Sequence, residues 1–159
     1  MKRFHVLLLA FVLLIFSFSP QSIFASSNAK TEITYNPDGS YVITTLNISY
    51  TAAYSTSKTA SKTASKTAVA YSPNGSKICT FTVTGTFEIN SGSSVSCTSA
   101  SYSKNIYDST WNFISASTSR NNSSSSKASA SAKGYFKNAT GGSQTLTPTV
   151  YCDKNGNIS

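Results

Sequence analysis

The sequence predicts an all-β protein, an antiparallel β-sandwich of immunoglobulin-like architecture that follows an N-terminal signal peptide. Two observations favour sheet over helix. Residues 79–89 alternate strictly between core-type and polar side chains, the pattern of a strand with one face in a core and one in water. Several more short alternations follow between turns rich in Gly, Asn and Pro, and no helical period accompanies them.

The first 25 residues are expected to be the signal peptide. The chain begins with the basic pair Lys2–Arg3, continues with an almost wholly apolar run over residues 6–18, and reaches the small residue Ala25, which suits cleavage. The apolar run is shorter than the ~20 residues that a membrane-spanning helix needs. A protein that is secreted and not anchored in a membrane is therefore expected.

Cleavage leaves about 134 of the 159 residues, the size of one domain. We expect a flexible lead-in over residues 26–38 and a single sandwich domain over residues 39–159. Without Lys2 and Arg3, 11 basic residues face 5 acidic ones, a net charge of about +6. Such a protein can bind anionic cell wall, mucin or lipid surfaces. Nucleic acid is not an expected partner, because no basic cluster is interleaved with aromatics.

The first half of the chain alternates strands and turns. Asn36–Gly39 is a turn in which Pro and Gly supply the required φ angles, and residues 41–50 read as a strand. Residues 72–76 form a second turn before the strand at 79–89. A turn at residues 90–94 pairs residues 95–102 back onto it. Aligned apolar faces then place Phe87 opposite Cys97.

The second half continues in the same way. A short strand carries Trp111 and Phe113, and residues 120–126 are expected to be a polar loop. Residues 127–137 alternate with small side chains on the inner face, which indicates that another part of the chain approaches closely there. Pro148 lacks a backbone donor, so the last strand, residues 144–153, is expected at a sheet edge. The expected core residues are Phe81, Val83, Phe87, Trp111 and Phe113.

Residues 57–68 are three copies of Ser-Lys-Thr-Ala. A period of four does not follow one helix face, and in a strand it places Lys58, Lys62 and Lys66 on one side. The segment is interpreted as an exposed edge strand protected by lysine, or as a flexible basic loop. The functional hypothesis is that Lys58, Lys62 and Lys66 form a stripe that binds a polyanion.

Export permits disulfides, and the chain has three cysteines. In the expected hairpin, Cys79 lies far along the ladder from Cys97, so these two are not expected to pair. Cys97 and Cys152 both point inward, and we predict a disulfide between them. Cys79 is then a buried free thiol. A reactive cysteine would need a neighbouring base, and no metal or other cofactor is expected.

Several segments resemble a family of small secreted proteins of Gram-positive, clostridia-like bacteria, a domain of unknown function. The resemblance rests on residues 82–87, residues 96–101, the pair Ser109 and Trp111, and the ending Cys152-Asp-Lys-Asn-Gly-Asn-Ile-Ser. It implies a cysteine at positions 97 and 152 and supplies no catalytic residues. In that family an aromatic often stands where this chain has Cys79.

These features predict a secreted, non-enzymatic sandwich that binds a cell-surface or extracellular polyanionic partner. The alternative is a secreted hydrolase that uses a Ser–Lys or carboxylate site, since the mature chain has no histidine. A third hypothesis is binding to ice or another crystal through the hydroxyl rank Thr80, Thr82, Thr84 and Thr86. Such ranks come in several parallel copies, and the sequence alone shows one.

Overall fold

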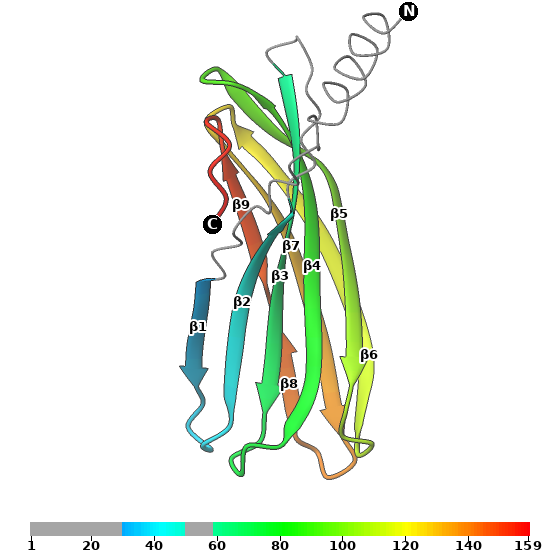
Figure 1. Ribbon diagram of the computed structural model, residues 1–159. Helices are drawn as coiled ribbons and strands as arrows, with labels where there is room; N and C mark the ends of the chain where they lie inside the picture. Colours follow the sequence, from blue (N-terminus) through cyan, green and yellow to red (C-terminus); the bar gives the residue numbers. More distant parts are fainter. Residues whose placement is uncertain (1–29, 50–58) are drawn as a thin grey trace, which may run out of the picture.

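The computed structural model describes residues 30–49 and 59–159, and these form an all-β protein with two antiparallel sheets (Figure 1). Sheet A contains β1 to β5 in chain order, and sheet B contains β6, β7, β8 and β9. The strands are β1 (Lys30–Tyr35), β2 (Tyr41–Ser49), β3 (Thr59–Tyr71), β4 (Lys77–Asn90), β5 (Ser94–Ile106), β6 (Trp111–Ser124), β7 (Lys127–Asn138), β8 (Ser143–Leu146) and β9 (Thr149–Asp153).

The strand order is that of two successive meanders. In sheet A every strand pairs with the one before it in the chain, and in sheet B β7 pairs with β6 on one side and with β8 and β9 on the other. This order does not confirm the immunoglobulin-like architecture, in which Greek-key connections pass the chain between sheets. Among the described residues, the contacts between the sheets come mainly from β3, β4 and β5.

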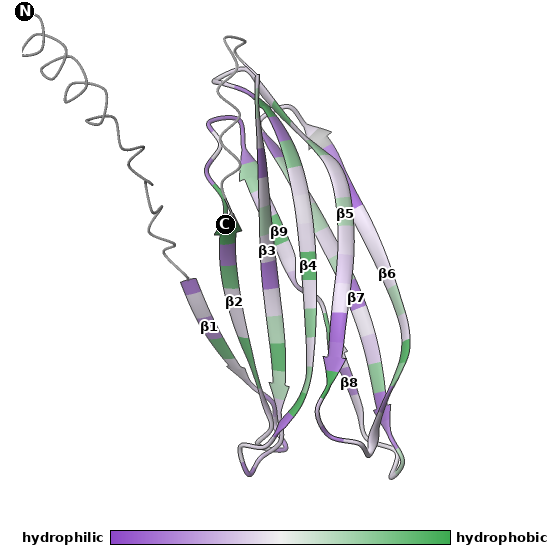
Figure 2. Ribbon diagram, turned by 45° about the vertical axis from the view of Figure 1, so that its right-hand side comes forward, coloured by the Kyte–Doolittle hydropathy of each residue, from purple (hydrophilic) through white to green (hydrophobic). Residues whose placement is uncertain are grey.

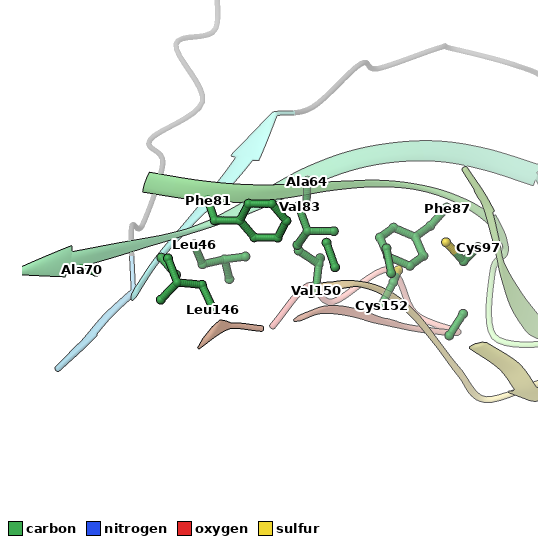
Figure 3. Close-up of a cluster of buried hydrophobic side chains, with 14 of the residues drawn as sticks. Leu46, Ala64, Ala70, Phe81, Val83, Phe87, Cys97, Leu146, Val150 and Cys152 are labelled. Atoms are coloured by element: carbon green, nitrogen blue, oxygen red, sulfur yellow. The ribbon is translucent and has the colours of Figure 1, made fainter. Parts of the chain in front are cut away.

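Strand β4 has the two faces that its alternation predicts, and Figure 2 shows its hydropathy changing from residue to residue. Phe81, Val83 and Phe87 are completely buried between the sheets, where Val150 of β9 lies with them (Figure 3). Phe136 of β7 belongs to the same core and its ring contacts Phe81. The predicted register is confirmed, because Phe87 lies opposite Cys97 and Ile89 opposite Val95. Trp111 and Phe113 are partly buried and pack at the margin of this core.

The two sheets approach each other closely at two inward-facing glycines, one in each sheet. A Cβ atom on Gly85 of β4 would lie 2.6 Å from the Cβ of Ala130, and one on Gly134 of β7 would lie 2.7 Å from the Phe81 ring. The small inner residues of β7 therefore accommodate β4 directly, as their pattern predicts.

Two of the predicted turns, at residues 36–39 and 72–76, form between β1 and β2 and between β3 and β4. Gly39 and Gly75 have φ values of 82° and 84°, which glycine adopts without strain. The backbone closes both turns, from Asn36 N to Ser40 O at 2.8 Å and from Ser72 N to Ser76 O at 2.9 Å.

Two segments differ from expectation. Residues 30–35, expected within the flexible lead-in, form β1, because Ile33 and Tyr35 alternate with polar residues and pair with β2. Residues 120–124, expected in a polar loop, continue β6 as an edge strand. There the Asn122 side chain accepts a hydrogen bond from Cys97 N at 2.7 Å and donates one to Cys97 O at 3.2 Å, which satisfies the backbone of the facing strand β5.

The last strand is interrupted at Pro148, and β8 and β9 together form an edge of sheet B. Ala132 N donates to Pro148 O at 3.2 Å, so β7 spans the interruption. Residues 157–159 then fold back along β9, where Tyr151 and Ser159 exchange two backbone hydrogen bonds of 2.8 and 3.0 Å.

Candidate functional site

The Ser-Lys-Thr-Ala repeat lies in β3, which is neither an edge strand nor a loop, because it pairs with β2 and with β4. The repeat places Lys62 and Lys66 on the inner face with the buried Ala64 and Ala68. Lys62 Nζ donates to Gly156 O at 2.7 Å, so this ammonium group binds the C-terminal segment. Lys58 lies outside the described residues. Lys62 and Lys66 therefore lie on the side of β3 that faces sheet B, and their role in binding a polyanion stays a prediction.

Lysines can occupy inner positions of β3 because β9, the edge of sheet B, lies near this strand. A groove there is lined by Lys30, Lys66, Lys127, Glu32 and Tyr151. Lys30 pairs with Glu32 at 3.3 Å, and Lys127 Nζ lies 4.2 Å from the centre of the Tyr151 ring. Lys66 has no ion-pair partner among the described residues. This groove could accept one anionic group.

The three cysteine thiols are free and buried, so the predicted bond between Cys97 and Cys152 is not formed in this structure. Burial raises the pKa of Cys79 to about 12 and that of Cys152 to about 11. Burial also raises the pKa of Cys97. Each thiol is protonated at neutral pH, so none is an activated nucleophile.

A hollow at the turn end of the molecule contains two carboxylates, Asp38 and Asp108, beside Trp111 and Asn138. Hydrogen bonds from Ser40 hold the pKa of Asp38 below its ordinary value, and hydrogen bonds from Thr110 do the same for Asp108. Both groups are charged at neutral pH. Neither has the raised pKa that a glycosidase needs in its general acid.

These aspartates, with Asp153, predict an acid-sensitive stability. The folded pKa of each lies below the ordinary 3.8, and for Asp153 the main cause is the Asn157 side chain. The ionised carboxylates stabilise the fold fully at pH values above their pKa in the unfolded chain. This stabilisation is lost as the pH falls through their pKa in the folded protein. We expect the thermal midpoint to fall below roughly pH 4. Thermal unfolding monitored by circular dichroism measures it, and an Asp108→Asn/Asp153→Asn variant should show a smaller fall. An equal fall in the variant would contradict this assignment.

The outer face of sheet A is open to solvent and begins with a row of tyrosines beside the turns. Tyr35, Tyr41 and Tyr71 lie directly opposite one another on β1, β2 and β3. Their ring centres are 5.6 Å apart for Tyr35 and Tyr41, and 4.9 Å apart for Tyr41 and Tyr71, which stack with an angle of 8°. We call these three residues the tyrosine row.

The aromatic surface continues past the tyrosine row. Lys77 lies opposite Tyr71 in the next strand, and its Nζ lies 4.3 Å from the centre of the Tyr107 ring. Hydrogen bonds with the side chains of Asn105 and Thr80, which pair on the same face, lower the pKa of Tyr107. Tyr35 is 72% exposed and Tyr107 is 51% exposed.

Rows of hydroxyl groups cross the same face above the tyrosine row. The register of the sheet aligns the threonines of β4 with hydroxyl residues on its neighbours, so the expectation of a single rank is wrong. Two of these rows, which we call the hydroxyl rows, are Thr31–Thr45–Thr67–Thr82–Ser103 and Ser65–Thr84–Ser101, the second of which Asn47 extends with a side-chain amide. Within the first row the hydroxyls of Thr67 and Thr82 are 2.9 Å apart.

Sequence reasoning identified the β4 rank but not this surface, because the rows depend on which strands are neighbours. The signal for this surface in the sequence was the position of Tyr35 and Tyr41 on either side of the first turn, which brings the two side chains together. No family model, curated protein or solved structure matches the chain. None of the described residues belongs to a helix able to cross a membrane.

Proposed function

We propose that the chain is a secreted, non-enzymatic β-sandwich protein that binds an extracellular or cell-surface polymer through the outer face of sheet A. The observation that carries the proposal is the tyrosine row. Isolated exposed apolar residues are ordinary, whereas a contiguous set marks an interaction surface. Ile33, 53% exposed, and Ile43 and Val69 lie in the next row and extend this set.

The signal-peptide pattern supports secretion, and the resemblance to small secreted proteins of clostridia-like bacteria agrees with it. The protonated cysteines and the charged Asp38 and Asp108 favour a binding role over hydrolysis. The Ser–Lys version of the hydrolase would have to use a lysine other than Lys62, whose ammonium group is bound to Gly156 O.

Retention of the protein by isolated bacterial cell walls, mucin and anionic liposomes, at low and at physiological salt, tests the proposal. We expect retention that persists in salt and is lost in a Tyr35→Ala/Tyr71→Ala variant. Lys66→Ala is the matched control on the other face of the same sheet. Retention that is unchanged in the tyrosine variant would contradict the proposal.

A polyanionic partner is the second candidate function, and the unpaired Lys66 beside Lys30 and Lys127 favours it. Three cations, of which Lys30 and Lys127 are exposed and Lys66 is partly buried, give an attraction that salt screens. Under this candidate, retention fades at physiological salt and Lys66→Ala weakens it. Equal binding by Lys66→Ala and the parent protein would exclude the groove.

We also propose that Cys97 and Cys152 join after export. The two side chains come from facing sheets, Cys97 from β5 and Cys152 from β9, and both lie in the buried core beside Phe87 (Figure 3). Each thiol loses a proton and an electron to a protein dithiol oxidase or to oxygen, and one S–S bond forms. In the chain-entropy model this loop contributes roughly 4 kcal/mol. The intact mass of the exported protein should be lower by two hydrogens, with one thiol titratable after unfolding. Three titratable thiols would contradict the bond.

A further inference from the structure

We infer that the outer face of sheet A binds a neutral, extended polysaccharide, with sugar rings against the tyrosine row and sugar hydroxyls against the hydroxyl rows. The inference rests on the proposed function, because it specifies the polymer that this face takes.

The tyrosine row supplies the apolar part of such a site. A pyranose ring has faces of C–H groups, and these pack on the electron-rich faces of aromatic rings. Tyr41 and Tyr71 are held in place by their mutual stacking, so little side-chain freedom is lost on binding. Tyr35 continues the row at the exposed edge of the sheet, and each phenol adds a hydroxyl that can donate and accept.

The hydroxyl rows supply the polar part. Each Ser or Thr hydroxyl has one donor and two acceptor positions. The bond between Thr67 and Thr82 uses only part of this capacity. Neighbouring strands are about 4.8 Å apart, so successive hydroxyls recur at a spacing comparable with one sugar unit. A polymer with a hydroxyl on most carbon atoms can therefore form several hydrogen bonds along one row.

The charges on this face favour a neutral polymer. In the described part of sheet A, the parity of the strands leaves only Lys77 and Glu88 charged on the outer side. Lys77 lies over Tyr107, and Glu88 lies beyond the hydroxyl rows. The other lysines and the glutamate of β1 and β3 face inward. An anionic chain would find no array of cations here.

The residue types on the outer face of sheet A favour a glycan over a protein partner or a crystal surface. Serine is depleted in protein–protein interfaces, and Ser and Thr are rare among the residues that dominate their binding energy, yet both fill these rows. A crystal face is also a poor match for this surface. Neighbouring strands are twisted by about 20° relative to one another, so five strands do not present a flat array of hydroxyls. A flexible chain can follow that twist.

Affinity electrophoresis of the purified protein in gels that contain hydroxyethyl cellulose, xylan, mixed-linkage β-glucan or glucomannan tests the inference. Hyaluronan and alginate serve as anionic comparisons. We expect at least one neutral polysaccharide to retard the protein without dependence on salt. Loss of one tyrosine contact should weaken binding about tenfold in Tyr35→Ala and Tyr71→Ala. Thr84→Val, which keeps the shape and removes the hydroxyl, should weaken it by about fivefold.

Tyr151→Ala is the matched control, because Tyr151 is 38% exposed and lines the groove on the other side of sheet A. Circular dichroism verifies that each variant is folded. Retardation that is lost in the tyrosine variants and kept in Tyr151→Ala supports the inference.

Four results would overturn it. Retention by cell walls or mucin that needs the tyrosine row, without retardation by any neutral polysaccharide, would reject the glycan and leave the proposed function standing. Retardation by the anionic polymers alone would assign the ligand to the lysine groove. A dimer in sedimentation that becomes a monomer in Tyr35→Ala would show that a second copy occupies the face. Absence of binding to every probe, cell walls and mucin included, would reject both proposals.

Discussion

Gly85→Ala is expected to destabilise the protein by roughly 2–3 kcal/mol, within the range found when extra atoms enter a packed core. The new Cβ would lie 2.6 Å from the Cβ of Ala130 and 3.1 Å from the Phe87 ring. A Cβ atom is fixed to its backbone, so relief requires one sheet to move away from the other. The gain in strand propensity from replacing glycine, about 0.5–1 kcal/mol, is smaller than this cost. The midpoint of urea unfolding measures the loss.

The double variant Gly85→Ala/Ala130→Gly is the matched control, because it moves the methyl group from one sheet to the other. We expect it to recover most of the stability, since the two changes are coupled through one contact. If Gly85→Ala were as stable as the parent protein, the close approach of β4 and β7 would be wrong.

Phe81→Ala is expected to remove about 3–5 kcal/mol, the usual cost of deleting a buried aromatic ring. The Phe81 side chain is completely buried and meets the Phe136 ring edge-on at 6.0 Å between centres. It also fills the space above Gly134, so its removal leaves a cavity that neither sheet can close. Domains of this kind are stable by only 5–15 kcal/mol, so much of the protein would unfold on mild heating.

Differential scanning calorimetry measures this loss. Phe81→Leu should cost less, because it keeps part of the buried volume. Tyr35→Ala, at an exposed position, should stay within about 0.5 kcal/mol of the parent. A small loss in Phe81→Ala would place the centre of the core elsewhere.

Much of the fold was predictable because each long strand buries one face. The parity of residues 79–89 predicted the burial of β4 and its register with β5. The small residues of β7 predicted the close contact with β4. Gly39 and Gly75 marked turns that only positive φ angles close.

The interior position of β3 was not predictable, because its inner face alternates alanine with lysine. A lysine inside a sandwich is costly unless its ammonium group reaches a partner. Lys62 donates to the backbone oxygen of Gly156, which lies 94 positions away in the sequence. The polar end of β6 was missed for a similar reason. Its strand character depends on pairing with β7 and on the side chain of Asn122, not on apolar periodicity.

The candidate site was the least predictable part. Tyr71 joins Tyr41 only because β3 pairs with β2, and the hydroxyl rows exist only because five strands run side by side in chain order. Alternating Thr residues in a single strand are not informative about function, because Thr is common in β-strands. The same residues in register across a sheet become a surface with a repeat.

Tyrosine-selective iodination, read by peptide mass spectrometry with and without bound cell walls, tests the central claim that the outer face of sheet A is the binding surface. The protein carries its own controls, because Tyr102 and Tyr151 are 42% and 38% exposed away from that face. We predict that bound cell walls protect Tyr35, Tyr71 and Tyr107 and leave Tyr102 and Tyr151 reactive. Protection of Tyr151 with continued labelling of Tyr35 and Tyr71 would contradict it and place the partner in the lysine groove.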